Sequence, residues 1–263
     1  RAAGAGCNCS PGKGNFMFRI CLVSLVLFGA ACSARADSAV DVVRLATEWK
    51  MSLDEHGKVT ALTMKPGRAT EVLGRILESA IRGWAFEPGA INGEPAATET
   101  SLVVGITLSP VDDGERYSAR IDNVRTGGSI EKITTMPVFT SNQADRVRKD
   151  RVNPLVMLLV TYDVNGRPEE VLVADESPVR KGGLASQAVS AVKTWIFSPE
   201  RVAGHGIRAR ALVPVCFVAV VDKNGQGDCK DSRPDGTNSP EMGQSLALST
   251  EVRLKSDVIG RLL

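Results

Sequence analysis

Histidine and tyrosine are scarce in this sequence. Its 263 residues include two His and two Tyr, and aromatic residues make up 5% of the chain. The histidines, His56 and His205, stand beside glycines in two separate predicted turns, so we interpret them as solvated turn residues and not as metal ligands or general bases. The sequence contains no Walker loop, Rossmann glycine pattern, G-x-S-x-G elbow or H-E-x-x-H motif. These absences indicate a protein that is not an enzyme and uses no cofactor or metal.

An excess of charge of one sign is also lacking. The formal net charge is +2, from 32 basic and 30 acidic residues. Four of the basic residues and none of the acidic ones fall within residues 1–36, so the rest of the chain is close to neutral, at about −2. The acidic pairs Asp54-Glu55 and Glu169-Glu170 flank predicted turns, where paired charges are ordinary. Because no basic patch remains, the sequence does not predict a nucleic-acid partner.

The chain has one long hydrophobic run, and it lies near the beginning. Arg19 follows Met17, an apolar stretch runs from Ile20 to Ala31, and Ala34-Arg35-Ala36 ends the region. This is the layout of a signal peptide, and the apolar stretch is shorter than the roughly 20 residues of a membrane span. We expect residues 1–36 to be an upstream segment and a cleaved signal peptide, with no stable membrane span. A lipoprotein acylated at Cys32 is the alternative.

Two cysteines, Cys216 and Cys229, remain once residues 1–36 are removed. In an exported protein this pair favours a disulfide that closes a loop of about a dozen residues, and two free thiols are the other possibility. The early pair, Cys7 and Cys9, has no neighbouring histidine and makes a poor metal site. No Cys-x-x-Cys motif indicates a redox catalyst.

One short phrase occurs twice, as WAFEPGAINGEP and as WIFSPERVAGHG. In both copies a Trp is followed by Phe two places later, by Pro four places later and by Gly nine places later. A helix that ends at the Trp directs both rings into a core, the Pro prevents the helix from resuming, and the Gly permits a tight turn. We therefore interpret the phrase as structural, with an aromatic ligand platform as the alternative. The residues concerned are Trp84, Phe86, Pro88, Gly93, Trp195, Phe197, Pro199 and Gly204.

The same elements surround both copies. A D-x-x-G turn precedes a strand and an apolar helical stripe that ends at the Trp, and another strand follows the phrase. The order indicates an internal duplication. The predicted strands are 49–53, 59–64 and 101–108 in the first copy and 155–162, 170–174 and 208–221 in the second; the predicted helices are 72–84 and 184–195.

These patterns predict an α+β fold of two tandem small β-β-α-β modules, each an antiparallel sheet with one helix packed on it. The modules span 37–110 and 154–229. Between them, 111–153 is predicted to be a connector with strands at 115–124 and 130–135, in which 142–153 is a charged connection. Residues 230–263 are predicted to be a polar tail with a possible last strand.

The combined pattern resembles the C-terminal domain of the TonB family of energy transducers, over residues 49–108 and 154–221. Two copies behind a signal peptide resemble tandem TonB-like periplasmic proteins of Gram-negative bacteria. The resemblance implies a periplasmic module for transmembrane transport that binds an extended plug-domain segment of outer-membrane transporters by strand addition. The chain departs from the family pattern by lacking the membrane helix, the Pro-rich spacer and the Tyr-Pro pair that precedes the first strand of the domain.

A binding role would fall on the last strand of the second copy. Arg208, Arg210 and Leu212 share one face of this strand by the period of two, and its backbone would offer the edge. We therefore expect a non-enzymatic protein-binding module. The alternative is a structural protein that associates with itself through the same edges and has no transporter partner.

Overall fold

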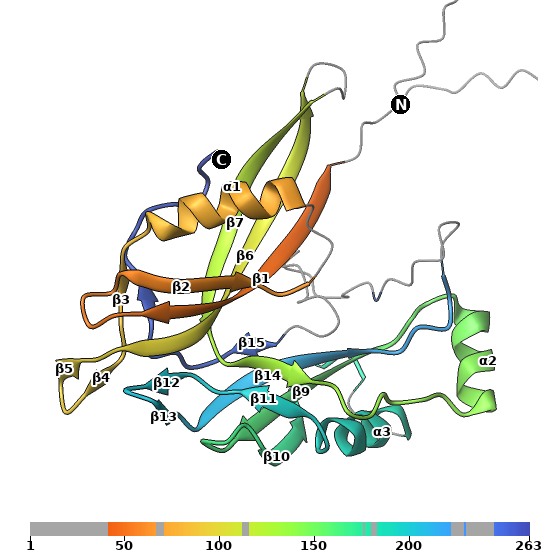
Figure 1. The fold of residues 1–263 in the computed structure, drawn as a ribbon. Helices are drawn as coiled ribbons and strands as arrows, with labels where there is room; N and C mark the ends of the chain where they lie inside the picture. The colour runs from red at the N-terminus through yellow and green to blue at the C-terminus, as the bar shows by residue number, and fades with distance from the viewer. Residues whose placement is uncertain are drawn as a thin grey trace, which may run out of the picture. The chain divides into compact units, whose positions relative to one another are not determined.

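The computed structural model describes residues 42–66, 71–111, 116–175, 177–179, 183–221, 229 and 245–263. All of them belong to one compact unit that extends from Val40 to Leu263. The expected signal peptide, with Cys7, Cys9 and Cys32, lies outside the described residues, as does the polar stretch 230–243. Figure 1 shows the arrangement of the described helices and strands.

The fold is α+β, as predicted: mostly antiparallel strands with three helices in the described part of the chain. The elements of the first half are β1 (Val43–Leu53), β2 (Val59–Met64), α1 (Glu71–Arg82), β3 (Phe86–Glu87), β4 (Ala90–Ile91), β5 (Glu94–Pro95), β6 (Thr98–Val111), β7 (Arg116–Gly127) and β8 (Ser129–Lys132). Those of the second half are α2 (Ser141–Asp150), β9 (Leu155–Tyr162), β10 (Pro168–Val173), α3 (Gly183–Val192), β11 (Ile196–Ser198), β12 (Arg201–Val202), β13 (His205–Gly206) and β14 (Ala209–Cys216). Two short strands follow, β15 (Leu246–Ala247) and β16 (Arg253–Leu254).

The first sheet has β1 and β6 at its centre. They pair antiparallel along the whole of β1, from Val43 opposite Leu108 to Leu53 opposite Thr98. β2 flanks β1 on the outside, and β7 flanks β6. Helix α1 lies over one face and contacts β2 (Figure 1). Its residues Leu77 and Ile81 enter a core formed with Trp49, Leu102 and other apolar residues of the sheet.

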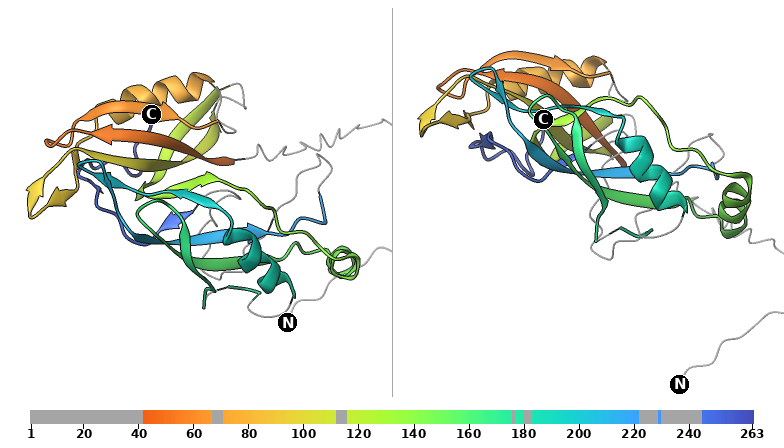
Figure 2. Two further views of the ribbon diagram at one scale, coloured as in Figure 1. Left: turned by 60° about the horizontal axis from the view of Figure 1, so that its bottom comes forward. Right: turned by 90° about the horizontal axis from the view of Figure 1, so that it is seen from below.

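The second sheet has the order β10, β9, β14, β15. Helix α3 contacts β9 and β10, and the views in Figure 2 show it beside these strands. Its residue Ala188 is fully buried and belongs to a core that includes Val160 of β9 and Val213 of β14. A smaller apolar cluster, which includes Met157 and Leu212, occupies the opposite face. Both faces of β9 are therefore largely covered.

Several predicted element boundaries are wrong. The first strand was expected over 49–53, but β1 begins at Val43, because its whole length pairs with β6. The last strand of the second half was expected over 208–221, but β14 ends at Cys216. One more bond of the ladder follows, from the Phe217 amide to the Pro154 carbonyl at 3.0 Å. The Ala219 and Val220 amides then both donate to the side-chain oxygen Oδ1 of Asn153 at 2.9 Å, so a side chain replaces the backbone partner at this point.

The charged connection expected at 142–153 contains helix α2. Thr140 caps it, because the Thr140 hydroxyl accepts from the Gln143 amide and the Gln143 side chain accepts from the Thr140 amide. The capping box can be recognised in the sequence as a Thr followed by a Gln three places later. The helix itself has no apolar stripe in the sequence, because Val147 is its one buried residue.

Short strands link the two halves. β12 continues the first sheet by pairing with β6, with Arg201 opposite Glu99 and Val202 opposite Thr98. β11 pairs with β8. Residues 245–263, which we call the 245–263 segment, contribute β15 to the second sheet and pair β16 with β3. The segment also places Val252 and Val258 in the core of the first half.

Candidate functional site

The aromatic residues of the repeated phrase are buried. Trp84 and Phe86 lie in the core of the first half with their ring centroids 6.4 Å apart. In the second half Phe197 stacks on Tyr162 at 4.9 Å, and the Trp195 indole N–H donates to the Thr135 carbonyl at 2.7 Å. None of the four repeated aromatic side chains is more than 9% exposed. These rings therefore pack the cores and present no open face to a ligand.

Each repeated phrase also contacts the glycine of its own D-x-x-G turn. Gly57 lies against the carbonyl of Phe86, and Gly166 lies against the carbonyl of Phe197. Both glycines have positive φ, 77° and 79°. The Phe197 amide donates to the Gly166 carbonyl at 2.8 Å. The two pieces of the sequence pattern are thus one structural unit in both halves.

The remaining residues of the phrase shape the chain after the helix. Pro88 and Pro199 lie close to the turn glycines, with Cδ 3.4 and 3.3 Å from where a Cβ on Gly57 or Gly166 would lie. Gly93 and Gly204 sit at the tips of the hairpins β4–β5 and β12–β13 with φ of 86° and 80°. These glycines serve hairpin turns, which require positive φ.

The structure places the three predicted partner-binding residues at or beside β14. Arg208 precedes the strand and pairs its guanidinium Nε with Glu169 Oε2 at 2.6 Å. Arg210 is exposed, whereas Leu212 is buried in the small cluster on the outer face of the second sheet. Their assigned role stays a prediction, because no bound partner is present to test it.

The backbone edge beside these residues is occupied by the chain itself. β15 pairs with β14 at Ala211 and Leu212, and the Leu248 amide donates to the Arg210 carbonyl at 2.9 Å. Backbone groups alternate in direction along a strand, so Pro214 directs its nitrogen to this same outer edge, where it has no hydrogen to donate. The outer edge of β14 therefore offers little room to an added strand while β15 is in place.

The last strand of the first half is covered in the same way. β7 pairs with β6 from Ser101 opposite Gly127 to Val111 opposite Arg116. The outer edge of β7 is in turn bonded by the 245–263 segment, whose Leu263 amide donates to the Ala119 carbonyl at 2.9 Å. In both halves the strand that follows the repeated phrase is thus flanked by this chain.

The second strand of each half is open. β2 ends the first sheet and β10 ends the second, and neither pairs with a further strand in the described part of the chain. The Lys65 amide donates inward to the Glu48 carbonyl, so by alternation the backbone groups of Leu62 and Met64 point outward. The Ala174 amide donates inward to Met157, so Val171 and Val173 point outward from β10. In each half the open edge belongs to the strand that follows the D-x-x-G turn.

The two open edges differ in how well they are protected. β10 begins with Pro168, carries Glu169 and Glu170 and has a register shift between Pro168 and Glu170. Prolines, charges and bulges all discourage an added strand. β2, with the sequence VTALTM, contains neither proline nor charge. The edge of β2 is therefore the less protected of the two and is our candidate binding site.

One charged side chain, Glu200, is buried among the described residues, at 3% exposure. Its carboxylate accepts from the Thr100 hydroxyl at 2.6 Å, the Thr250 hydroxyl at 3.0 Å and the Glu251 amide at 2.7 Å. Burial raises the pKa of Glu200, and burial together with the charge of Glu200 raises the pKa of Tyr162. Sequence reasoning missed this site, because a Glu after a Pro in a loop gives no signal of burial.

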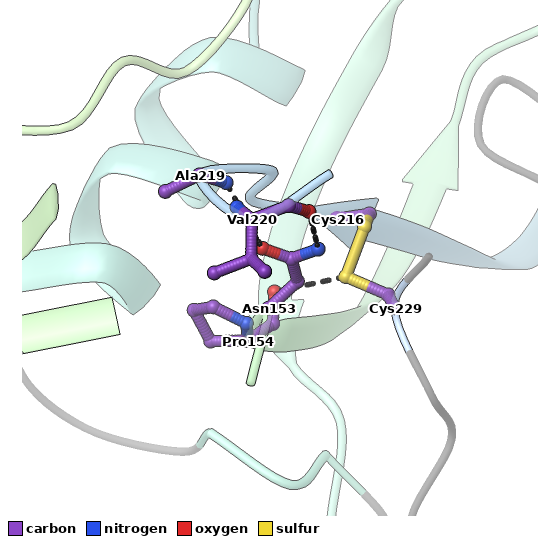
Figure 3. The surroundings of a disulfide bond; sticks show 6 residues. All are labelled: Asn153, Pro154, Cys216, Ala219, Val220 and Cys229. Carbon is purple, nitrogen blue, oxygen red and sulfur yellow. Dashed lines mark hydrogen bonds between the residues drawn. A yellow bond between two sulfur atoms is a disulfide. The ribbon is translucent and has the colours of Figure 1, made fainter. Parts of the chain in front are cut away.

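A disulfide joins Cys216 to Cys229, with their Cα atoms 5.8 Å apart. Figure 3 shows it beside Asn153 and Pro154. The sulfur of Cys229 lies 3.3 Å from the Pro154 carbonyl oxygen, a close contact in which the sulfur has no hydrogen to donate. The side-chain nitrogen Nδ2 of Asn153 donates to the Val220 carbonyl at 2.7 Å. The end of β14 is thus held by one covalent bond and by the hydrogen bonds of Asn153.

The residues that the structure describes show neither a metal-binding cluster nor a helix that could span a membrane. They contain no cluster of three or more His, Cys, Asp or Glu side chains placed to hold a metal ion. Among the same residues, no helix has the length and apolar character needed to span a membrane. Comparison of the chain with protein-family models, with curated proteins and with solved structures finds no match in any of the three.

Proposed function

We propose that the chain is a non-enzymatic periplasmic binding protein, built from two divergent copies of one β-β-α-β module, that takes up an extended segment of a partner protein by strand addition. The repeat is supported by equivalent contacts in both halves. Gly57 lies against the Phe86 carbonyl, and Gly166 lies against the Phe197 carbonyl in the same way. The Lys65 amide donates a hydrogen bond to β1, and the Ala174 amide donates one to β9. Equivalent contacts at equivalent positions favour duplication over coincidence.

The open edge of β2 is the single observation that carries the binding proposal. Leu62 and Met64 leave outward amides and carbonyls in a strand with no proline or charge. An exposed edge of this kind either pairs with another chain or is protected. An incoming strand would take main-chain hydrogen bonds worth about 0.5–1.5 kcal/mol each from these residues.

The partner class follows from the resemblance to the TonB C-terminal domain. It is an extended plug-domain segment of an outer-membrane transporter, bound as an added strand. The proposal differs from the expectation drawn from the sequence in the edge that is used. β7 and β15 flank the strands after the two repeated phrases, so we place binding on the second strand of the first half.

Site-specific photo-crosslinking in cells tests the proposal. Thr63 on β2 and Leu172 on β10 are equivalent, and both side chains are exposed beside an open edge. A crosslinker at Thr63 should form adducts with outer-membrane transporters, with the crosslinked peptide in the plug domain, and a crosslinker at Leu172 should form few. Adducts with transporters at Leu172 but not at Thr63 would refute the choice of edge, and none at either would refute strand addition to both.

A substitution pair provides the matched control. Thr63→Glu places a charge at the rim of the β2 edge opposite Lys50, which keeps the pairing within the sheet favourable. It should weaken binding of a synthetic plug-domain segment about fivefold or more, because strand addition would bury the new charge. Leu172→Glu should leave that binding unchanged. Equal effects of the two variants would contradict the proposal.

A further inference from the structure

Glu200 lies where three separate parts of the chain meet. It follows Pro199 of the second repeated phrase, Thr100 belongs to β6 of the first half, and Thr250 and Glu251 belong to the 245–263 segment. The same segment also covers the outer edge of β14. Its residues Leu246 and Leu248, which shortly precede Thr250, lie beside that strand. The state of Glu200 therefore bears directly on how this stretch of the segment is held.

No ion pair within the described residues balances a charge on Glu200. The titratable groups around it are Tyr162 on β9 and Glu251 on the segment, and the carboxylate of Glu251 adds repulsion. Beside it in the chain, the Arg201 guanidinium is directed to the Gly204 carbonyl at 3.3 Å, and Glu99 of β6 lies opposite Arg201. An ionised Glu200 is consequently a buried negative charge without a cation. Its three hydrogen bonds favour the ionised form but only partly offset the cost of burial, so the net effect is to raise its pKa.

A protonated Glu200 satisfies the same partners. Its O–H can donate to the Thr250 hydroxyl oxygen, which in turn donates to the Val252 carbonyl at 3.1 Å. The other carboxyl oxygen still accepts from the Glu251 amide, bonded at 2.7 Å. The Thr100 hydroxyl, 2.6 Å from the oxygen that carries the proton, can still donate to a lone pair of that oxygen. The neutral form therefore keeps all three contacts and removes the unbalanced charge.

We propose that Glu200 is a proton-dependent latch for residues 245–251: the stretch is fastened when Glu200 is neutral and opens locally when Glu200 ionises. Opening uncovers the edge of β14 at Arg210 and Leu212, which β15 otherwise occupies. The latch can be tested on the chain without a partner. A negative result for the latch would therefore not contradict binding at β2, and a negative result for binding at β2 would not contradict the latch.

The direction of the pH effect follows from the environments of Glu200. In the fastened state burial raises the pKa of Glu200, whereas in the open state an exposed Glu has a pKa of about 4.3. The equilibrium constant for opening then rises about tenfold per pH unit between these two values and is constant above the higher one. Acid fastens the stretch, and neutral pH loosens it.

Residue-resolved amide hydrogen exchange of the full chain tests the latch. Protection is measured from below pH 4 to pH 8 and corrected for intrinsic exchange. The amides of Leu248 and Glu251, which bond Arg210 and Glu200, should lose about tenfold protection per pH unit through that window. The Lys255 amide, which bonds the Ala85 carbonyl at 2.9 Å in the same segment, should not change with them. Equal losses at Lys255, or none at Leu248 and Glu251, would overturn the latch.

Glu200→Gln should abolish the pH dependence. Its amide oxygen accepts from the Glu251 amide, and its NH₂ group donates to the Thr100 and Thr250 hydroxyls, which have carbonyl acceptors of their own. Glu99→Gln, an exposed carboxyl on β6, is the control and should keep the wild-type profile. A profile unchanged by Glu200→Gln would refute the latch. If that variant does not fold, Thr250→Val serves instead: it should lower protection of Leu248 in acid about tenfold, and an unchanged value would count against the proposal.

Discussion

Replacing Gly166 by Ala should destabilise the protein by about 3–6 kcal/mol. A left-handed residue other than Gly costs about 1–2 kcal/mol, and Gly166 has φ of 79°. A Cβ at this position would also lie 2.7 Å from the Phe197 carbonyl carbon and overlap its oxygen. Relieving that overlap adds about 1–3 kcal/mol of packing strain and weakens the bond from the Phe197 amide to the Gly166 carbonyl, worth about 1 kcal/mol.

Gly204→Ala is the matched control. Gly204 has φ of 80°, but a Cβ there meets nothing within 4 Å, so the variant should lose only about 1–2 kcal/mol. Urea unfolding followed by far-UV circular dichroism measures both free energies of unfolding. The equivalent pair in the first half, Gly57→Ala and Gly93→Ala, should show the same contrast. Equal losses for Gly166→Ala and Gly204→Ala would refute the claim that contact with the repeated phrase, and not φ alone, requires the turn glycine.

Three further perturbations test other parts of the fold. Trp195→Ala should cost about 3–5 kcal/mol in chemical denaturation, since the indole is buried and hydrogen-bonded to Thr135; a variant that stayed fully stable but lost binding would instead support a ligand platform. Glu200→Ala should cost about 2–4 kcal/mol in the same assay, because it leaves the Glu251 amide unsatisfied and a cavity behind, and a neutral result would show that the site relaxes or fills with water. Removing the disulfide by Cys216→Ser with Cys229→Ser should cost about 3 kcal/mol for a separation of 13 residues, and reductant should lower the wild-type unfolding midpoint but not that of the variant.

The elements that periodicity encodes were largely predictable. The apolar stripes end at Trp84 and Trp195, and the structure has α1 and α3 over the predicted stretches. Three of the four strands beside the D-x-x-G turns lie at or near their predicted positions, because alternating apolar and polar residues indicate a strand. The fourth, β1, begins at Val43, six residues before its predicted start. Helix α2 was missed because one buried residue, Val147, makes no stripe.

Contacts between distant segments were not predictable. The pairing of Arg201 with Glu99 involves a strand of two residues, which has no periodicity to read. The same holds for β15, whose position decides that the edge beside Arg210 is occupied. The open edge of β2 could not be chosen in advance, because the sequence of a strand does not state which of its neighbours will be covered.

The position of Val252 and Val258 has a consequence for the order in which the protein can fold. Both are buried in the core of the first half, at 0% and 5% exposure, although most of that core comes from residues 49–121. A ribosome makes these two valines more than a hundred residues after β1, β2, β6 and β7, the strands whose core they complete. The first half therefore cannot finish its core before residues 252–258 have been made, and a growing or translocating chain keeps that apolar surface unfilled until they arrive.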